Sequence, residues 1–322
     1  MAPADSGLQP VLCGEVRTSV LRTSEALTAR TAAQLLNLRP DEPVLLSERP
    51  NLRVVSPHLL TGVDCRLPAA GGSRPRAVGT VAGRAVLTEG RVLQTSAFAR
   101  LVPSEGSHRR AWGHYLLRPG VVEPLARHQA RDVVDGFLAA APLPGGVLNP
   151  GAVAERLLDH VLRHPLLDQR APFKSGRTRL RWAALPAAEG AGASIERFTV
   201  AADGLRTVAL RTPVADPAAV AALCEDLALH DWLLTTLLAL VERSRLGSGD
   251  GEAVLAALRP LVDHLLHLWM PGARVPDGLS GVWETLEKQP GFSRQWQTLV
   301  QRIRDQVAVQ TAPLSRRVLA SS

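Results

Sequence analysis

Three residues in the first quarter of the sequence carry side chains that could form a nucleophilic site. His58, Asp64 and Cys65 fall within one stretch of eight residues, and a thiol beside a histidine base is a common arrangement for covalent catalysis. We expect residues 56–68 to form a loop, where reactive groups are often placed. The sequence assigns no further residue to orient the histidine, and a free cysteine is usually a small buried apolar residue. Catalysis by Cys65 is therefore one interpretation, and burial of its side chain is the other.

A second group of polar and aromatic residues occupies the stretch 107–115, which reads S-H-R-R-A-W-G-H-Y. Paired arginines can hold a carboxylate or a phosphate through parallel hydrogen bonds, and neighbouring aromatic faces can stack. We interpret this stretch as an anion- or partner-binding site. The alternative is a solvated strand end with ion pairs to Glu105 and Glu123. The candidate binding residues are His108, Arg109, Arg110, Trp112, His114 and Tyr115.

Between positions 163 and 181 the sequence is strongly basic, with Asp168 as its only acidic residue. A basic run of this kind can follow the phosphate backbone of a nucleic acid. Its second half also alternates arginine with Thr178, Leu180 and Trp182, which is typical of the solvent-facing side of a strand. The sequence lacks a recognition helix and an aromatic strand platform, so nucleic-acid binding is the less favoured interpretation. The residues of this second basic patch are Arg170, Lys174, Arg177, Arg179 and Arg181.

The sequence signatures of common enzyme families are absent. There is no G-x-x-x-x-G-K-[ST] phosphate loop, no G-x-S-x-G or H-E-x-x-H motif, and no acidic calcium loop. Three histidines on predicted helices, His230, His264 and His267, lack the carboxylate and E-x-x-H spacing of a dimetal bundle. We therefore predict no metal and no cofactor. The sequence favours a non-catalytic protein, and an enzyme built from scattered residues is the alternative.

The composition is that of a protein with a substantial core, since 46% of the 322 residues are apolar. The cysteines at 13, 65 and 224 form no C-x-x-C pair, which indicates a reducing compartment. The N-terminus lacks the basic and apolar regions of a secretion signal. Apolar runs within 232–241 are much shorter than the roughly 20 residues that a membrane span requires. We expect a cytoplasmic protein without a membrane span.

The net charge of +7 is unevenly distributed along the chain. Residues 1–182 carry 24 Lys and Arg against 15 Asp and Glu, whereas residues 183–322 carry 13 against 15. The basic half contains every candidate site residue named above. Binding is therefore expected to involve this half of the chain.

Local patterns predict that the first part of the chain is rich in β-structure. Alternating runs at 78–87 and 91–102 flank T-E-G-R, a turn that Gly90 permits by adopting positive φ, so they predict a hairpin. Two strands alone are marginal, so we expect further strands to join them. These strands are predicted at 11–21, 44–47 and 52–55, with a helix at 24–38.

The second part is predicted to be mainly helical. Its longest helix spans 216–245, begins with Asp216 as N-cap and Pro217 as the first helical residue, and is apolar around most of its circumference. Such a helix must be nearly surrounded by protein. A strand pair turning at Ala202-Asp203-Gly204 interrupts the helical part. Other helices are predicted at 124–140, 150–163, 251–270, 281–289 and 292–309.

These patterns predict an α+β fold with two structured parts. The N-terminal β-rich domain contains a mixed or antiparallel sheet, and the C-terminal domain is a helical bundle with an inserted β-hairpin. We place a flexible tail at 1–10, the β-rich domain at 11–120, the helical domain at 121–310 with its hairpin at 178–210, and a second flexible tail at 311–322.

Four strings of the sequence resemble an uncharacterised family of proteins from actinobacteria. They are T-G-V-D-C-R-L-P at 61–68, L-H-D-W-L-L-T-T at 229–236, H-L-W-M-P-G-A-R at 267–274 and P-G-F-S-R-Q-W at 290–296. The resemblance spans nearly the whole chain and implies a bacterial cytoplasmic protein. It implies no activity and no functional residues.

The function we expect is that of a non-catalytic adaptor or subunit of a bacterial cytoplasmic multi-protein system, acting through protein–protein contacts. A homo-oligomer is a further arrangement that these features allow. The first alternative is an enzyme acting on an anionic small molecule or peptide, with a site formed by residues 58–65 and 107–115. The second alternative is a nucleic-acid-binding protein.

Overall fold

The sheet is built on two long antiparallel strands, β5 (Arg76–Thr88) and β6 (Val92–Leu101), joined by a tight turn. Gly90 in this turn has φ +57°, a conformation that glycine adopts without steric cost. The predicted hairpin is confirmed. The computed structural model describes residues 10–71, 74–104, 106–139, 143–243 and 251–320.

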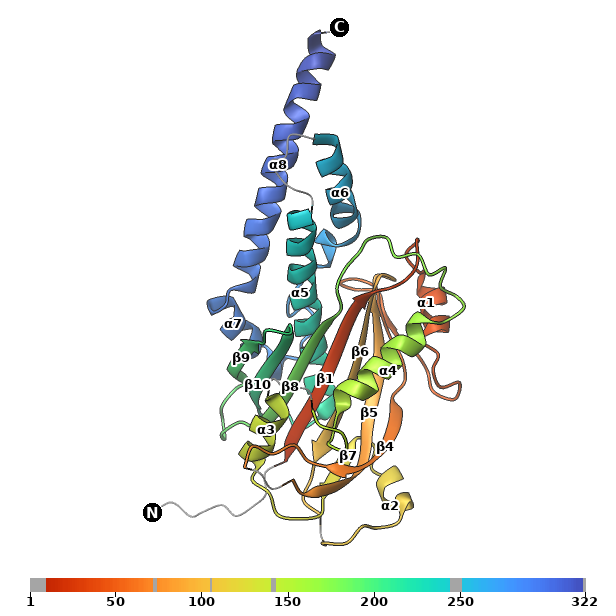
Figure 1. The fold of residues 1–322 in the computed structure, drawn as a ribbon, viewed down its shortest axis with the longest axis vertical. Helices are drawn as coiled ribbons and strands as arrows, with labels where there is room; N and C mark the ends of the chain where they lie inside the picture. Colours follow the sequence, from red (N-terminus) through yellow and green to blue (C-terminus); the bar gives the residue numbers. More distant parts are fainter. Residues whose placement is uncertain (1–9, 72–73, 105, 140–142, 244–250, 321–322) are drawn as a thin grey trace.

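Ten strands of the described chain form one mixed sheet (Figure 1). The strand order is β2-β3-β5-β7-β6-β1-β8-β10-β9, and β4 pairs with β5 beside this path. The remaining strands are β1 (Val11–Val20), β2 (Leu45–Ser47), β3 (Arg53–Val55), β4 (Leu59–Arg66), β7 (Val121–Pro124), β8 (Thr178–Pro186), β9 (Ser194–Val200) and β10 (Leu205–Thr212).

The pairing of β1 joins the two halves of the chain. One edge of β1 pairs with β6, and its other edge pairs with β8 from the second half. The predicted boundary near residue 120 therefore falls within a single sheet, and the helical bundle with an inserted hairpin is not confirmed. The backbone polar groups of a buried strand need partners on both edges, which is why β8 continues the sheet. The strand pair around 202–204 is confirmed as β9 and β10.

Helices cover both faces of the sheet (Figure 1). Cys13 of β1 faces the side covered by α3 (Ala130–Leu138) and α4 (Pro150–Leu162), while Leu12 and Val16 face α5 (Pro217–Arg243). This alternation follows from the period of two in a strand. The protein therefore has a sheet between two helical layers, and most of its strands are buried on both faces.

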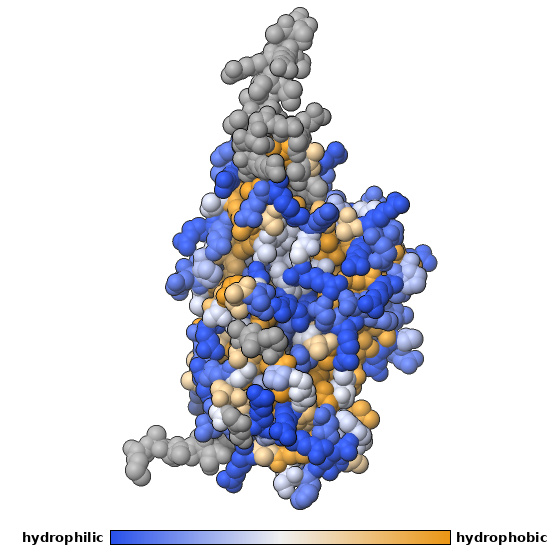
Figure 2. All heavy atoms as spheres, viewed as in Figure 1, coloured by the Kyte–Doolittle hydropathy of each residue, from blue (hydrophilic) through white to orange (hydrophobic). Residues whose placement is uncertain are grey.

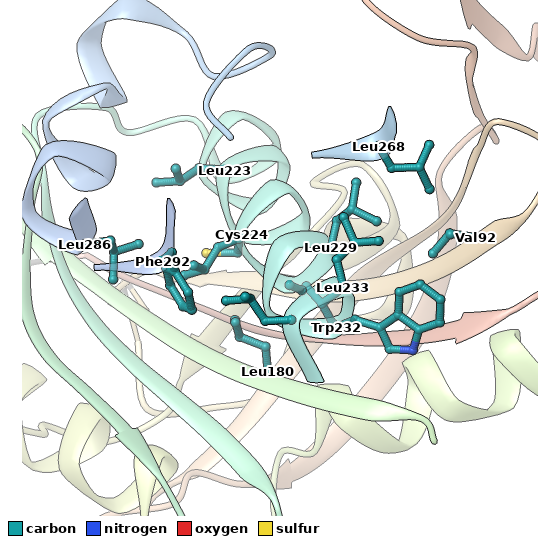
Figure 3. Packing of buried hydrophobic residues seen from close by; sticks show 14 of the residues in the cluster. Val92, Leu180, Leu223, Cys224, Leu229, Trp232, Leu233, Leu268, Leu286 and Phe292 are labelled. Carbon is teal, nitrogen blue, oxygen red and sulfur yellow. The ribbon is translucent and has the colours of Figure 1, made fainter. Parts of the chain in front are cut away.

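The α5 helix lies at the centre of the largest apolar cluster, as its sequence predicts (Figure 3). Trp232 and Leu233 of α5 are completely buried against the sheet, and Phe292 and Leu286 cover its other side. Burying each such side chain contributes about 1.5–3 kcal/mol. The covering helices are α6 (Gly251–His264), α7 (Gly281–Lys288) and α8 (Phe292–Ala320), with short 3₁₀ turns at Leu266–Leu268 and Asp277–Leu279. α6 and the far part of α8 extend beyond the end of the sheet (Figure 1).

Several local predictions are corrected by the structure. Residues 59–66 form strand β4 and not a loop, because pairing with β5 outweighs the low strand propensity of Gly62 and Asp64. The helix predicted at 124–140 begins only at Ala130, as α3, and residues 121–124 form β7. The predicted tail at 311–322 is helical through Ala320, and the predicted N-terminal tail at 1–10 lies, apart from Pro10, outside the described residues.

Two shorter helices complete the fold. α1 (Ala29–Leu35) is capped by Thr28 and is shorter than the helix predicted at 24–38, and α2 (Trp112–Leu116) follows the sheet strand β6. In the part of the chain that the structure describes, no helix has the length and apolar character needed to cross a membrane.

Candidate partner-binding surface

The stretch 107–115 contains both a buried anchor and exposed side chains. Tyr115 is buried, and its hydroxyl oxygen accepts a hydrogen bond of 3.0 Å from the backbone N–H of Arg110. The rings of Trp112 and His114 contact the Tyr115 ring edge to face. Tyr115 therefore fixes α2 against the sheet, while His108 and Arg109 remain on the surface beside it.

Arg109 and Trp112 form a second group with Asp64 of β4. The Arg109 guanidinium lies 5.0 Å from the centre of the Trp112 ring, and its Nε is 3.5 Å from Asp64 Oδ2. Arg76 donates two hydrogen bonds of 2.7 Å to the same carboxylate. The hydrogen bonds from Arg76, followed by the charges of Arg76 and Arg109, lower the pKa of Asp64, while desolvation opposes them. Asp64 of β4 thus lies beside α2, in contact with Arg109.

Glu123 of β7 holds the other end of α2. His114 Nε2 lies 2.8 Å from Glu123 Oε1, and Arg118 donates a short hydrogen bond to the same oxygen. The sequence suggested Glu123 as a partner for arginines of the stretch 107–115. The structure instead shows contacts to Glu123 from His114 and Arg118, and Glu105 lies outside the described residues.

Large apolar side chains are exposed on the same face. Between 36% and 85% of each remains accessible, with Leu117 the most exposed. The Trp112 ring lies on Gly62 of β4, where a Cβ would approach it to 3.2 Å, so the ring and the outward face of β4 are in contact. Hydrophobic residues are interspersed with hydrophilic ones at the lower end of the molecule, where α2 lies (Figure 2). We call Leu60, Trp112, Leu116 and Leu117, together with Arg76, Arg109, Arg110 and Arg118, the α2 surface.

The structure does not bring the predicted nucleophilic residues together. His58 precedes β4 and Cys65 lies near the far end of this strand. Seven residue steps along an extended chain place their Cα atoms roughly 23 Å apart. Cys65 packs beside the core under α3, and burial raises the pKa of its thiol to about 11. His58 packs edge-on against the ring of Phe98. Asp64 points to the opposite face of β4 from Cys65.

The second basic patch is divided among ion pairs. Arg177 pairs with Glu155 and Asp159 of α4, and Arg179 pairs with Asp203. Arg181 is buried, contrary to the expected solvent-facing position, because it pairs with Glu15 and donates to the carbonyl oxygens at the end of α3. The two remaining residues, Arg170 and Lys174, are exposed and have no carboxylate within 4 Å among the described residues.

A buried ion cluster centred on Glu225 was not identified from the sequence. Glu225 of α5 is inaccessible to solvent and accepts two hydrogen bonds from Arg84, at 2.7 and 2.9 Å, and one from Arg53 at 2.8 Å. Ser96 donates a further bond of 2.5 Å. Burial acts to raise the pKa of Glu225, but the nearby charges of Arg84 and Arg53 outweigh it and lower the pKa. The available signal was the presence of carboxylates at Glu225, Asp226 and Asp231 within an otherwise apolar helix.

His230 has no ring nitrogen left for a metal or a substrate. Its Nδ1–H donates to the Asp226 carbonyl oxygen at 2.7 Å, and its Nε2 accepts from the Met270 N–H at 3.1 Å. Trp269 and Trp283 pack edge-on against the ring. Within the described ranges, no three His, Cys, Asp or Glu residues are grouped as metal ligands.

No protein-family model, curated protein or solved structure matches the chain. The resemblance to an actinobacterial family stays a prediction.

Proposed function

We propose that the protein is a non-catalytic adaptor or subunit of a bacterial cytoplasmic multi-protein system and that it binds its partner through the α2 surface. The observation that carries the proposal is the exposure of four large apolar side chains on one helical turn and the adjoining strand. Apolar groups gathered in this way commonly mark interaction sites. Tryptophan and arginine, which lie in contact here, are the residues most enriched at the centres of protein interfaces.

The charges of the α2 surface favour an acidic partner. Arg76, Arg109 and Arg118 face two carboxylates, Asp64 and Glu123, among the described residues, and Glu123 is buried. The apolar side chains require apolar groups on the partner as well. The partner we propose is a protein segment that carries both apolar side chains and Asp or Glu, because a complementary charge speeds association and suppresses wrong partners.

The α2 surface is also held in place before binding. Tyr115 is buried beneath it, Trp112 lies on Gly62, and Asp64 fixes Arg109 beside the indole ring. Side chains ordered in this way lose less conformational entropy when a partner binds. This order supports a binding role for the surface.

The test is affinity purification of the tagged protein at its native level, with a Leu117→Asp variant. Leu117 is 85% accessible, so the change leaves the fold intact while placing a charge in the apolar surface. We expect a stoichiometric partner of the wild type to be lost from the variant. Leu166→Asp is the matched control, since Leu166 is exposed on the segment between α4 and β8, away from α2.

Two results would contradict the proposal. One is retention of every partner in Leu117→Asp, and the other is equal loss of the partner in Leu166→Asp. Light scattering on the pure protein separates a further outcome. A dimer that dissociates only in Leu117→Asp would show that the occupant of the surface is a second copy of the chain, which contradicts the acidic partner.

A further inference from the structure

A small crevice opens at the other end of the sheet edge, where the connection from β2 to β3 meets α5 and the segment after Trp269. Asn51 and Arg53 line one side, and Arg274 and the half-exposed Met270 line the other. The crevice is distinct from the α2 surface because none of its lining residues belongs to that surface. Its polar groups show what it can bind.

Arg274 has hydrogen-bond donors to spare. A guanidinium carries five N–H groups, and this one makes three bonds, one to Ser47 Oγ at 3.1 Å and two to the Asn51 carbonyl and side-chain oxygens. Across the described residues no carboxylate lies within 4 Å of this guanidinium. Burial lowers the pKa of Arg274, and the nearby positive charge of Arg53 lowers it further, while Asp226 and Glu89 act in the opposite direction.

Arg53 adds a second guanidinium with unsatisfied capacity. Its Nη2 donates to Glu225, but its Nε–H is buried and has no acceptor among the described groups. A buried donor without an acceptor is unfavourable, because it has lost its hydrogen bonds to water. The crevice is therefore lined by two guanidinium groups whose unbonded polar atoms are all hydrogen-bond donors.

One oxygen of the carboxylate in the wall is already in use. Asp226 Oδ2 accepts from the Gly272 N–H at 2.9 Å and from Trp283 Nε1 at 2.8 Å. The ring nitrogens of His230 are both bonded, as described above. The unused donors of Arg274 and Arg53 therefore favour a ligand that supplies acceptor oxygens.

The interior of the crevice is small. Its enclosed part measures about 20 Å³, which is space for about one water molecule. One edge of a planar carboxylate fits such a space, and guanidinium groups bind carboxylates through parallel hydrogen bonds.

The neighbouring strand β2 indicates what carries the carboxylate. β2 ends the path of the sheet, so its outer edge has no paired strand among the described residues. Leu45 and Leu46 on β2 are 64% and 45% exposed, and Ser47 at its end contacts Arg274. An extended peptide can add to such an edge through main-chain hydrogen bonds. We propose that the crevice between Arg53 and Arg274 binds the carboxylate of an extended peptide that lies along the exposed edge of β2.

The proposal can be tested by fluorescence polarisation with three labelled peptides on the full-length protein. The first is Leu-Thr-Val-Leu-Val with a free terminal carboxylate, the second is the same peptide amidated, and the third is amidated with Asp in place of its last Val. We expect a peptide with a carboxylate to bind at least about tenfold more tightly than the neutral amide, which is the usual effect of a charge-assisted hydrogen bond.

The three peptides also separate the sources of the carboxylate. Preference for the free acid over both amides identifies a chain terminus, and preference for the Asp peptide over the amidated parent identifies an acidic side chain. In Arg274→Gln the preference should disappear. Arg259→Gln is the control, because Arg259 is an exposed arginine of α6 that pairs with Asp263 and does not line the crevice.

A variant that leaves the crevice unchanged keeps the test decisive if Arg274→Gln does not fold. Leu45→Asp adds a negative charge to the exposed β2 edge and should weaken binding of both carboxylate peptides. Equal binding of all three peptides, no binding of any of them, or unchanged affinity in both variants would overturn the proposal. Failure here leaves the α2 surface unaffected, since the two tests change different residues.

Discussion

Two buried carboxylates hold helices to opposite faces of the sheet, and they do so in different ways. Glu225 projects from the middle of α5 to Arg84 and Arg53 on the sheet. Glu15 stays within the sheet, where it pairs with Arg17 of β1 and Arg181 of β8. On the first face the helix supplies a charged side chain. On the second face the buried pair is contacted by backbone groups at helix ends, and Glu155 of α4 adds a partly exposed carboxylate beside Arg17.

The backbone contacts on the second face come from helix ends. Arg181 donates to the Phe137 and Ala139 carbonyl oxygens at the end of α3. Near the start of α4, a Cβ on Gly151 would lie 2.5 Å from the Glu15 carboxylate, so only glycine allows this approach. A carboxylate at a helix N-terminus is favoured by the helix dipole. Attachment through one mid-helix side chain makes stability depend on that residue. Attachment through helix ends spreads the stability over several contacts.

Glu225→Gln should have the largest effect, because it leaves two buried arginines without a negative partner. We expect a loss of about 3–5 kcal/mol in the free energy of unfolding, measured by urea denaturation. Glu242→Gln, an exposed change on the same helix, is the control and should be nearly neutral. A loss below about 1 kcal/mol for Glu225→Gln would mean that α5 does not depend on this residue.

Glu15→Gln should cost less, about 2–3 kcal/mol by the same measurement. Arg17 keeps Glu155 at 3.3 Å, and Arg181 keeps its two carbonyl acceptors on α3. The difference between this variant and Glu225→Gln tests the comparison directly. Equal losses would show that the helix-end contacts add nothing.

Gly151→Ala tests the close approach of α4 to Glu15. The added methyl group meets the Glu15 carboxylate at 2.5 Å, and such overpacking typically costs about 1–3 kcal/mol. Gly145→Ala, where a Cβ meets no atom within 4 Å, provides the comparison variant. Thermal unfolding should show a lower Tm for the first variant only, and equal Tm values would refute the close approach.

Asp231→Asn should have the smallest effect, within about 1 kcal/mol. Burial raises the pKa of Asp231, and Arg206 opposes this effect. The contribution of Asp231 to stability is therefore present below the ordinary pKa of 3.8 and is lost as the pH rises through the native pKa. Glu225 has a lowered pKa, so its contribution is present above 4.5 and is lost as the pH falls through the native value. In urea unfolding at about pH 4 and 7, the stability of Asp231→Asn relative to the wild type should be greater at the higher pH, and Glu225→Gln should show the opposite trend.

The sequence predicts the elements whose signals are local. The hairpin turning at Gly90 and the helix beginning at Pro217 are both encoded within one stretch, and both are confirmed. β4 was missed because Gly62 and Asp64 disfavour a strand until β5 pairs with it. The pattern of an isolated segment does not contain that pairing.

For the candidate site, too, the sequence predicted only what a local stretch encodes. Clustering of aromatic and basic residues in 107–115 was visible in the sequence, and the structure brings Asp64 to Arg109 from a distant strand. The Glu225 cluster depends on Arg53 and Arg84, which are far from Glu225 in the chain and meet it only after the sheet and α5 have packed. The separation of His58 from Cys65 likewise follows from the extension of β4 and not from their spacing in sequence.

The pairing of β1 with β8 has a consequence for synthesis on the ribosome. Glu15 and Arg181 on these strands are 166 positions apart, so translation at about 5–20 residues per second separates their emergence by roughly 10–30 s. During that interval the nascent β1 has no neighbour along one edge, and an unpaired strand edge attracts other chains. β1 is thus made before the other described strands, yet its second edge stays open to other chains until β8 has emerged.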